Sequence, residues 1–269
     1  DGNVGSAQRL DKKIGKKIGH NMTQEWTVNS ACFSSKDSML LTTGNDNTAR
    51  IWNAATGRQI ISFVHESPVI CAVFSPDSKW ILTGSSDDTA RIWEIVTGKL
   101  IASFGHDNEV ISVAFSNDNT KVLTACKDIT PHLWNVVAKK ETTFSDSSLS
   151  ENGSIVLNAV FSHDGTKILT TSSDSTVRIL DLEGKQLVSL KHSDNVTDAV
   201  FSPNDSLVLT AGKDKSAYLW NIETKSRVGT AMKHAGPIYS VAFSEDGKQI
   251  LTAGWDNTIR LWDLQTVPI

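Results

Sequence analysis

The chain has 269 residues, of which 39% are hydrophobic and 21% are charged, a composition typical of a soluble globular protein. No apolar run approaches the roughly 20 residues that a membrane-spanning helix needs, so disorder and membrane insertion are excluded as dominant states. The formal net charge of -4 provides no overall positive field that would attract a nucleic acid backbone or an anionic membrane.

The three cysteines, Cys32, Cys71 and Cys126, lie far apart in the sequence and form no Cys-x-x-Cys pair. No signal-like hydrophobic stretch stands at the start of the sequence. Widely spaced cysteines of this kind are typical of a reducing compartment, so we expect a cytoplasmic location. None of the cysteines has zinc-site spacing beside a pair of histidines, and no metal or cofactor is expected.

In chain order, the first predicted element is a short strand at 12–19, with the sequence Lys-Lys-Ile-Gly-Lys-Lys-Ile-Gly. Six copies of one unit follow, at about 24–64, 65–105, 106–145, 146–191, 192–233 and 234–269. Each copy has a Phe-Ser pair, then a Thr four residues before an Asp, then a Trp or Leu six residues after that Asp. A period of about 40 residues indicates a repeat architecture such as a solenoid or a propeller.

Each copy contains short runs of Val, Ile, Leu and Thr separated by Asp, Asn, Gly, Ser or Pro, which is the pattern of strands and turns. In the second copy the predicted strands are 69–74, 79–83, 89–93 and 99–104. A single four-stranded sheet of this length exposes apolar side chains on both faces, so it must stack against neighbouring copies. The sequence therefore predicts an all-β fold whose sheets form a ring with short, protected edges.

The pattern of His, Val-x-x-x-x-Phe-Ser, Thr-x-x-x-Asp and Trp resembles the WD-repeat β-propeller family over residues from about 12 to 263. The resemblance implies a six-bladed β-propeller of four-stranded antiparallel sheets, in a single domain over 1–269. Residues 263–269 are too few for a fourth strand in the last blade. As in the family, the N-terminal strand at 12–19 is expected to pair with that blade and close the ring.

The resemblance also implies a hydrogen-bonded tetrad of His, Thr, Asp and Trp inside each blade. A buried Asp needs partners for its charge, a His between Asp and Thr supplies one, and the Trp indole N–H ends the chain of donors. Four copies carry the complete set: His65, Thr83, Asp87 and Trp93; His106, Thr124, Asp128 and Trp134; His192, Thr210, Asp214 and Trp220; His234, Thr252, Asp256 and Trp262.

Two copies depart from the tetrad. The first has Gln24 at the His position, since His20 lies four residues too early, and the fourth has Asn152 for His and Leu180 for Trp. We expect these two blades to be less rigid than the other four.

The His, Thr and Asp sets contain the residue types of nucleophilic and metal sites. An active site is normally single, whereas a group that recurs in every unit is most simply explained by the same packing role in each. No copy carries a cluster of polar residues that the other copies lack, so no catalytic residue is predicted and the protein is not expected to be an enzyme. An enzyme built on a propeller framework remains the alternative from another class.

A basic cluster, Lys12, Lys13, Lys16 and Lys17 with Arg9 nearby, lies at the predicted closing strand. Lysines on an outermost strand commonly prevent edge-to-edge aggregation. Binding of nucleic acid or of an acidic head group through 12–17 is the alternative, and it would weaken steeply with salt. The polar segment 145–154 lengthens one spacing between copies and is predicted to be a solvated loop, with a binding loop as the alternative.

The family resemblance places three positions of each blade on the propeller's top face, near the central channel. The residues at these positions differ from copy to copy, and exposed aromatic residues are typical of binding hot spots. An apolar arc there includes Ile155 and Leu157, for which packing into the channel wall is the alternative. The predicted partner-binding residues are Tyr239, Trp255, Lys213, Asn195, Thr197, Ile70, Ile111 and Lys127.

The function predicted from the sequence is a non-catalytic scaffold that binds a peptide or loop of a partner protein on this top face. No nucleic acid and no membrane is expected as a partner. We expect a monomer, or a part of a larger complex or multidomain chain.

Overall fold

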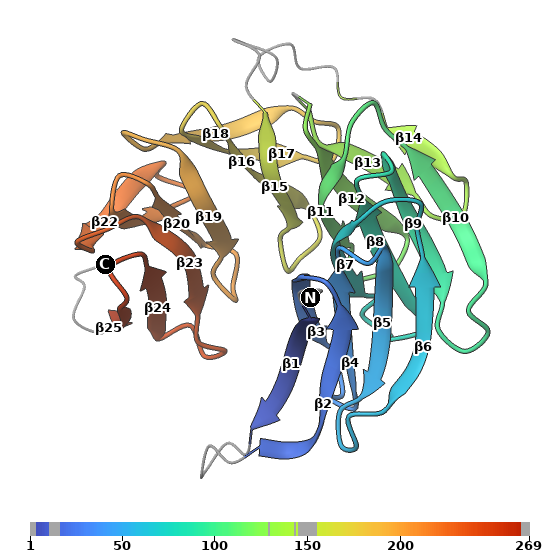
Figure 1. Ribbon diagram of the computed structural model, residues 1–269. Helices are drawn as coiled ribbons and strands as arrows, with labels where there is room; N and C mark the ends of the chain where they lie inside the picture. Colours follow the sequence, from blue (N-terminus) through green and yellow to red (C-terminus); the bar gives the residue numbers. More distant parts are fainter. Residues whose placement is uncertain (1–3, 11–16, 129, 143, 145–154, 265–269) are drawn as a thin grey trace. The chain divides into compact units, whose positions relative to one another are not determined.

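The computed structural model describes residues 4–10, 17–128, 130–142, 144 and 155–264, and the side chains from residue 22 onward (Figure 1). Within these ranges the chain forms strands β1 to β25 and no α-helix; a membrane-spanning helix is likewise absent from them. Contacts divide the chain into two compact units, residues 1–127 with 133–141 and residues 128–132 with 142–269.

Unit 1 holds two complete sheets and most of a third, each formed by strands consecutive in the sequence. Sheet 1 consists of β3 (Val28–Phe33), β4 (Met39–Gly44), β5 (Thr48–Asn53) and β6 (Gln59–Val64). Sheet 2 consists of β7 (Val69–Phe74), β8 (Trp80–Ser85), β9 (Thr89–Glu94) and β10 (Leu100–Gly105). Sheet 3 consists of β11 (Val110–Phe115), β12 (Lys121–Cys126), β13 (His132–Asn135) and β14 (Lys140–Thr142).

Unit 2 holds three further sheets with the same strand order. Sheet 4 consists of β15 (Val156–Phe161), β16 (Lys167–Ser172), β17 (Thr176–Asp181) and β18 (Gln186–Lys191). Sheet 5 consists of β19 (Val196–Phe201), β20 (Leu207–Gly212), β21 (Ser216–Asn221) and β22 (Ser226–Lys233). Sheet 6 consists of β23 (Ile238–Phe243), β24 (Gln249–Gly254) and β25 (Ile259–Asp263), three strands among the described residues.

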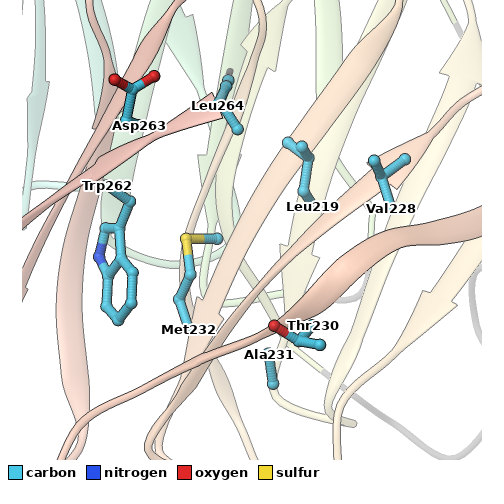
Figure 2. Close-up of a pocket in the computed structure, with 8 residues that line it drawn as sticks. All are labelled: Leu219, Val228, Thr230, Ala231, Met232, Trp262, Asp263 and Leu264. Carbon is cyan, nitrogen blue, oxygen red and sulfur yellow. The ribbon is translucent and has the colours of Figure 1, made fainter. Parts of the chain in front are cut away.

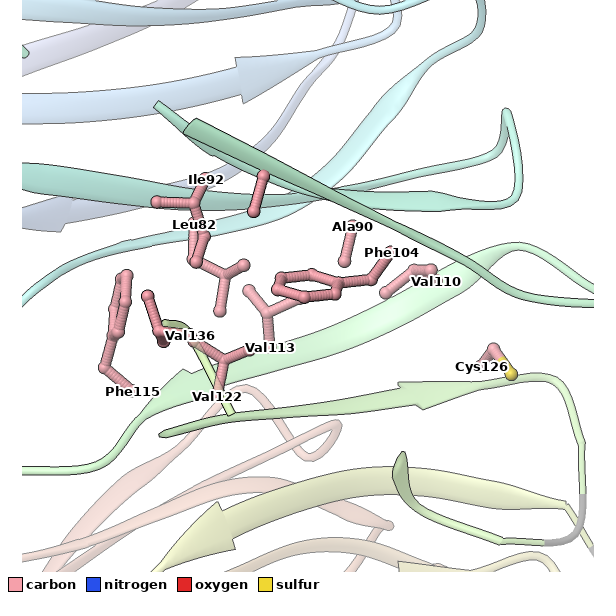
Figure 3. Packing of buried hydrophobic residues seen from close by; sticks show 11 residues of the cluster. Leu82, Ala90, Ile92, Phe104, Val110, Val113, Phe115, Val122, Cys126 and Val136 are labelled. Carbon is pink, nitrogen blue, oxygen red and sulfur yellow. The ribbon is translucent and has the colours of Figure 1, made fainter. Parts of the chain in front are cut away.

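The sheets are antiparallel meanders, and the second strands of sheets 1 to 5 are buried on both faces. In sheet 6, Leu251 of β24 is 42% exposed. In β8, Ile81 and Leu82 point to opposite faces and both are fully buried. Between sheets 2 and 3, Leu82 and Phe104 pack with Val113 of β11 (Figure 3). Burial of alternate faces by adjacent sheets explains why a single copy would not be stable alone.

The predicted all-β class with one antiparallel sheet per copy is confirmed. In the second copy β7 has the predicted bounds, whereas β8 begins one residue later than predicted and continues to Ser85. The extra residues pair with the start of β7, where the register shifts between Val69 and Cys71. A β-bulge of this kind is not visible in the hydrophobic pattern. The division into one domain over 1–269 stays a prediction.

The expected closing strand pairs differently. Residues 11–16 lie outside the described residues, and 17–19 belong to β2 (Lys17–Glu25), which pairs with β1 (Val4–Leu10). Lys17 lies opposite Leu10, and Ile18 opposite Arg9. Pairing with a strand only a few residues away has a low loop-closure cost, and the sequence analysis did not consider β1 as a strand. The prediction that 12–19 pairs with the last sheet is therefore not confirmed.

Candidate functional site

The interior of sheet 2 contains the predicted tetrad as a chain of hydrogen bonds. Trp93 Nε1 donates to Thr83 Oγ1 at 3.0 Å, Thr83 Oγ1 lies 2.7 Å from His65 Nε2, and His65 Nδ1 lies 2.8 Å from Asp87 Oδ2. The carboxylate can only accept, so the Nδ1–H of a neutral His65 donates to it and the Thr83 hydroxyl donates to Nε2. Burial lowers the pKa of His65, which Asp87 only partly offsets, and this favours the neutral ring.

Asp87 is the acceptor at the end of this chain, with a side chain only 5% exposed. Burial would raise its pKa, but hydrogen bonds from Thr89, from the Glu66 amide and from His65 outweigh burial, so the pKa lies below the usual value. Arg91 Nη2 lies 3.0 Å from the same carboxylate. Both carboxylate oxygens therefore accept hydrogen bonds, Oδ1 from Thr89 and Oδ2 from His65, the Glu66 amide and Arg91.

Sheets 5 and 6 repeat the arrangement. In sheet 5, Thr210 Oγ1 lies 2.7 Å from His192 Nε2 and accepts from Trp220 at 2.8 Å, and His192 Nδ1 lies 3.1 Å from Asp214. In sheet 6, Thr252 Oγ1 lies 2.7 Å from His234 Nε2 and accepts from Trp262 at 2.9 Å, and His234 Nδ1 lies 3.0 Å from Asp256. In sheet 3, Thr124 lies 2.7 Å from His106 Nε2 and accepts from Trp134 at 3.0 Å. Asp128, in unit 2, pairs with His132 Nε2 at 2.7 Å.

Sheet 1 builds the same chain with a glutamine. Thr42 donates to Gln24 Oε1 at 2.9 Å, Gln24 Nε2 donates to Asp46 at 2.9 Å, and Trp52 donates to Thr42 at 2.8 Å. The amide accepts from Thr and donates to Asp, as neutral histidine does, and Gln24 is 1% exposed. Gln24 thus keeps the direction of these hydrogen bonds and lacks the imidazole that can take up a proton.

Sheet 4 is the other departure. Leu180, at the Trp position, is fully buried, and Asn152 lies outside the described residues. Burial would raise the pKa of Asp174, but hydrogen bonds from Arg178 and Thr176 lower it to about 2. Arg178 Nη2 lies 2.6 Å from the carboxylate. The greater mobility predicted for sheets 1 and 4 stays a prediction.

The top face is the end of each sheet that carries the loop into its first strand and the turn between its second and third strands. In unit 2 the structure brings the five predicted residues of this face together. Trp255 and Tyr239 are 69% and 44% exposed, and their ring centroids lie 5.7 Å apart. The Thr197 hydroxyl donates to the carbonyl oxygen of Ile238, the residue before Tyr239. The Lys213 amide donates to the Asn195 carbonyl at 2.8 Å.

The predicted residues of the unit 1 top face, Ile70, Ile111 and Lys127, are half-buried or already paired. Glu109 accepts from Ser86 at 2.9 Å and forms an ion pair with Lys127; hydrogen bonds from Lys127 and Ser86 lower the pKa of Glu109. Ile70 and Ile111 are half-buried. The predicted residues of unit 1 therefore present fewer free groups to a partner than those of unit 2. In unit 2, Ile155 and Leu157 are also half-buried.

Trp26 is an exposed residue of the unit 1 top face that the sequence analysis missed. Its side chain is 57% exposed and its φ is 68°, a left-handed conformation that is costly for a bulky side chain. The corresponding loop positions of other copies hold Ser67, Asp194 and Gly236. A large aromatic residue among small and polar equivalents was the signal that could have identified it.

A pocket of about 210 Å³ opens between sheets 5 and 6 of unit 2 (Figure 2). Leu219, Val228 and Met232 of sheet 5 line it opposite Trp262 and Leu264. Its lining contains no histidine, cysteine or lysine, and its polar side chains are those of Thr230 and Asp263.

The family comparison agrees with this geometry. The WD domain, G-beta repeat family matches the chain in six segments: 12–53, 57–94, 98–135, 143–181, 184–221 and 225–263. The chain therefore belongs to the WD-repeat family, as the landmark residues predicted, and its sheets are blades of the family's β-propeller fold. Propellers of this family are generally non-catalytic scaffolds that bind protein partners. A search of curated proteins finds no matching relative.

Proposed function

We propose that this protein is a non-catalytic interaction scaffold that binds a peptide or loop of a partner protein on the top face of unit 2. The observation that carries the proposal is the exposed aromatic pair, Trp255 and Tyr239, with ring centroids 5.7 Å apart. Exposed aromatic side chains that lie together are enriched at binding hot spots.

The backbone beneath this pair is held in place before any partner arrives. The Trp255 amide donates to the Pro237 carbonyl at 2.8 Å, and a Cβ at Gly236 would lie 3.3 Å from the Trp255 Cβ. Thr197 holds the Ile238 carbonyl from the neighbouring sheet. A partner would therefore meet a pre-organised anchor, which lowers the entropy cost of binding.

Polar groups for orienting the partner lie on the adjacent sheet 5. Lys213 is exposed and its ammonium group makes no ion pair with any described residue, unlike Lys127 in unit 1, which pairs with Glu109. The Asn195 side chain likewise has no hydrogen bond to a described side chain. These groups supply hydrogen bonds and charge at the rim of the aromatic anchor, which is the usual arrangement of an interface.

The test combines a crosslinker with a paired substitution. A photoreactive amino acid replacing Tyr239 should form a crosslink to one set of proteins in cells, whereas the same group replacing Val64, an exposed residue of β6, should not. Tyr239→Ala with Trp255→Ser should abolish capture of that set at unchanged thermal stability. Serine is the residue that sheets 2 and 4 carry at the position of Trp255. Capture that survives both substitutions contradicts the proposal.

A further inference from the structure

A second exposed surface lies at the opposite end of the sheets of unit 1, at the turns between third and fourth strands. Val96 and Val137 occupy equivalent positions in these turns of sheets 2 and 3, and are 89% and 86% exposed. The corresponding turns of sheets 4 and 5 carry Glu183 and Glu223. Two fully exposed valines at positions where the same chain elsewhere uses glutamate are not explained by the repeat.

The packing of each turn fixes where these valines point. Ile95, just before Val96, is 8% exposed and packs with Ile61 and Phe63 of sheet 1. Val136, just before Val137, is 4% exposed and lies beside Phe115 in the buried cluster that sheets 2 and 3 form (Figure 3). Since the preceding residue is buried against the neighbouring sheet, the valine that follows faces solvent.

The turns lie against the fourth strands of the preceding sheets, which also expose apolar side chains. A Cβ at Gly98, two residues after Val96, would lie 2.9 Å from Ile61 Cδ1 in β6. Ile60 in β6 is 51% exposed, and Leu100, at the start of β10, is 43% exposed. The turn of Val96 thus lies beside β6, where the exposed Ile60 alternates with Ile61, and Val137 occupies the equivalent turn of sheet 3.

The apolar side chains are accompanied by bases. Exposed basic residues occur in the same turns and strand starts: Arg58, Lys99, Lys139 and Lys140. None of their side chains forms an ion pair with a described residue. The acids of these segments, Glu94 and Glu141, are half-buried, and Glu94 accepts from Thr97. We call this surface, formed by the two valines, Ile60, Leu100 and the four bases, the lower rim of unit 1.

We propose that the lower rim of unit 1 binds an acidic segment of a partner protein in which apolar side chains alternate with carboxylates. The apolar side chains would pack on Val96 and Val137, and the carboxylates would pair with the four bases. Charge complementarity favours an acidic partner, because the four bases make no ion pair with a described residue, whereas Asp77 of the adjoining turn already pairs with Lys79. Desolvation of the valines supplies affinity that charge alone, screened by salt, would not.

The lower rim shares no residue with the aromatic pair, which belongs to unit 2, and it differs from that pair in chemistry. Along β9, the turn that carries Asp87 and the turn that carries Val96 lie at opposite ends, so the lower rim does not overlap the top face of unit 1. The proposal therefore stands or fails independently of the Tyr239 and Trp255 assignment.

The probe for the test is a fluorescein-labelled synthetic peptide of about twelve residues in which leucine and glutamate alternate, a length that spans two blades. Binding to the full chain is measured by fluorescence anisotropy. We expect binding that weakens as salt is raised, and that is lost when leucine is replaced by serine or glutamate by lysine.

The decisive variant is Val96→Glu with Val137→Glu, which installs the residue of sheets 4 and 5. It should weaken binding of the peptide at least about tenfold, whereas the matched control Val64→Glu, an exposed valine at the other end of β6, should leave binding unchanged. Equal binding of the lysine peptide, or undiminished binding by the double variant, overturns the proposal. So does binding of phosphatidylserine vesicles without binding of the peptide, or a self-association of the chain that the double variant abolishes.

Discussion

The interior of sheet 6 repeats the residues of other copies, whereas its top face carries residues that the other copies lack. Inside, His234, Thr252 and Trp262 repeat the hydrogen bonds of sheets 2 and 5, with the same ring-to-hydroxyl distance of 2.7 Å. On top, Tyr239 and Trp255 have no counterpart in the other copies. Agreement between copies marks residues that every blade needs for its fold, and disagreement marks residues that the fold leaves free. The lower rim of unit 1 and Trp26 fall in the second group.

The largest expected effect of a substitution is in the interior. Asp87→Ala leaves the His65 Nδ1–H, the Glu66 amide and the Arg91 guanidinium without their acceptor. Loss of a nearly buried charged acceptor costs about 3 kcal/mol in the free energy of unfolding. Urea denaturation followed by tryptophan fluorescence measures this. A loss no larger than that of an exposed substitution would contradict the role of Asp87 in the interior of the blade.

A smaller loss is expected for Thr83→Val, which keeps the shape of the side chain and removes its hydroxyl. The Trp93 indole then has no acceptor and His65 Nε2 no donor, so unfolding should need about 2 kcal/mol less. The same denaturation experiment checks it. Thr83→Ser, which retains the hydroxyl, should recover most of the stability.

His65→Gln tests the interior hydrogen bonds through their dependence on pH, because Gln24 shows that an amide fits this position. The pKa of His65 is lowered in the folded state, so its contribution to stability is fully present above the unfolded-state pKa of about 6.5 and is lost as the pH falls below it. His65→Gln should cost about 1 kcal/mol or less at neutral pH and reduce the loss of stability between neutral pH and pH 5.

The reciprocal variant, Gln24→His, should increase the loss of stability over the same range of pH. His192 also has a pKa lowered by burial, so His65→Gln should reduce the pH dependence of the whole chain without abolishing it. Thermal unfolding at several pH values between 5 and 7.5 provides both measurements. A pH dependence that neither substitution changes would show that the histidines are not neutral in the folded protein.

The smallest effect on stability is expected on the top face. Trp255→Ser removes a side chain that is 69% exposed, and the free energy of unfolding should change by no more than about 0.5 kcal/mol. A larger loss would mean that Trp255 packs as part of the fold and is not available as an anchor.

Sequence periodicity was sufficient to predict the blades, because the landmark residues are those whose side chains the interior uses. The bounds of β7 followed from its apolar run, and the partners of His65 followed from the family pattern. Gln24 was predicted at the histidine position, but its ability to reproduce both hydrogen bonds became visible only from the positions of Thr42 and Asp46.

Pairing between distant or irregular segments could not be predicted in the same way. The sequence of residues 17–19 has the pattern of a fourth strand, but this pattern does not specify which strand it pairs with. In the structure these residues pair with β1, which is close in the chain. The ion pair of Lys127 with Glu109 depends on side chains that cross one blade, so Lys127 was taken for a binding residue. Trp26, Val96 and Val137 were missed because the family pattern directs attention to other positions.

The most direct test of the account compares one interior variant with one surface variant in the same capture experiment. At a temperature where both are folded, Thr83→Val should retain the protein partners that the unchanged chain captures, despite its lower stability. Tyr239→Ala with Trp255→Ser should lose them despite unchanged stability. The opposite result, with partners lost from the interior variant and kept by the surface variant, would contradict the account.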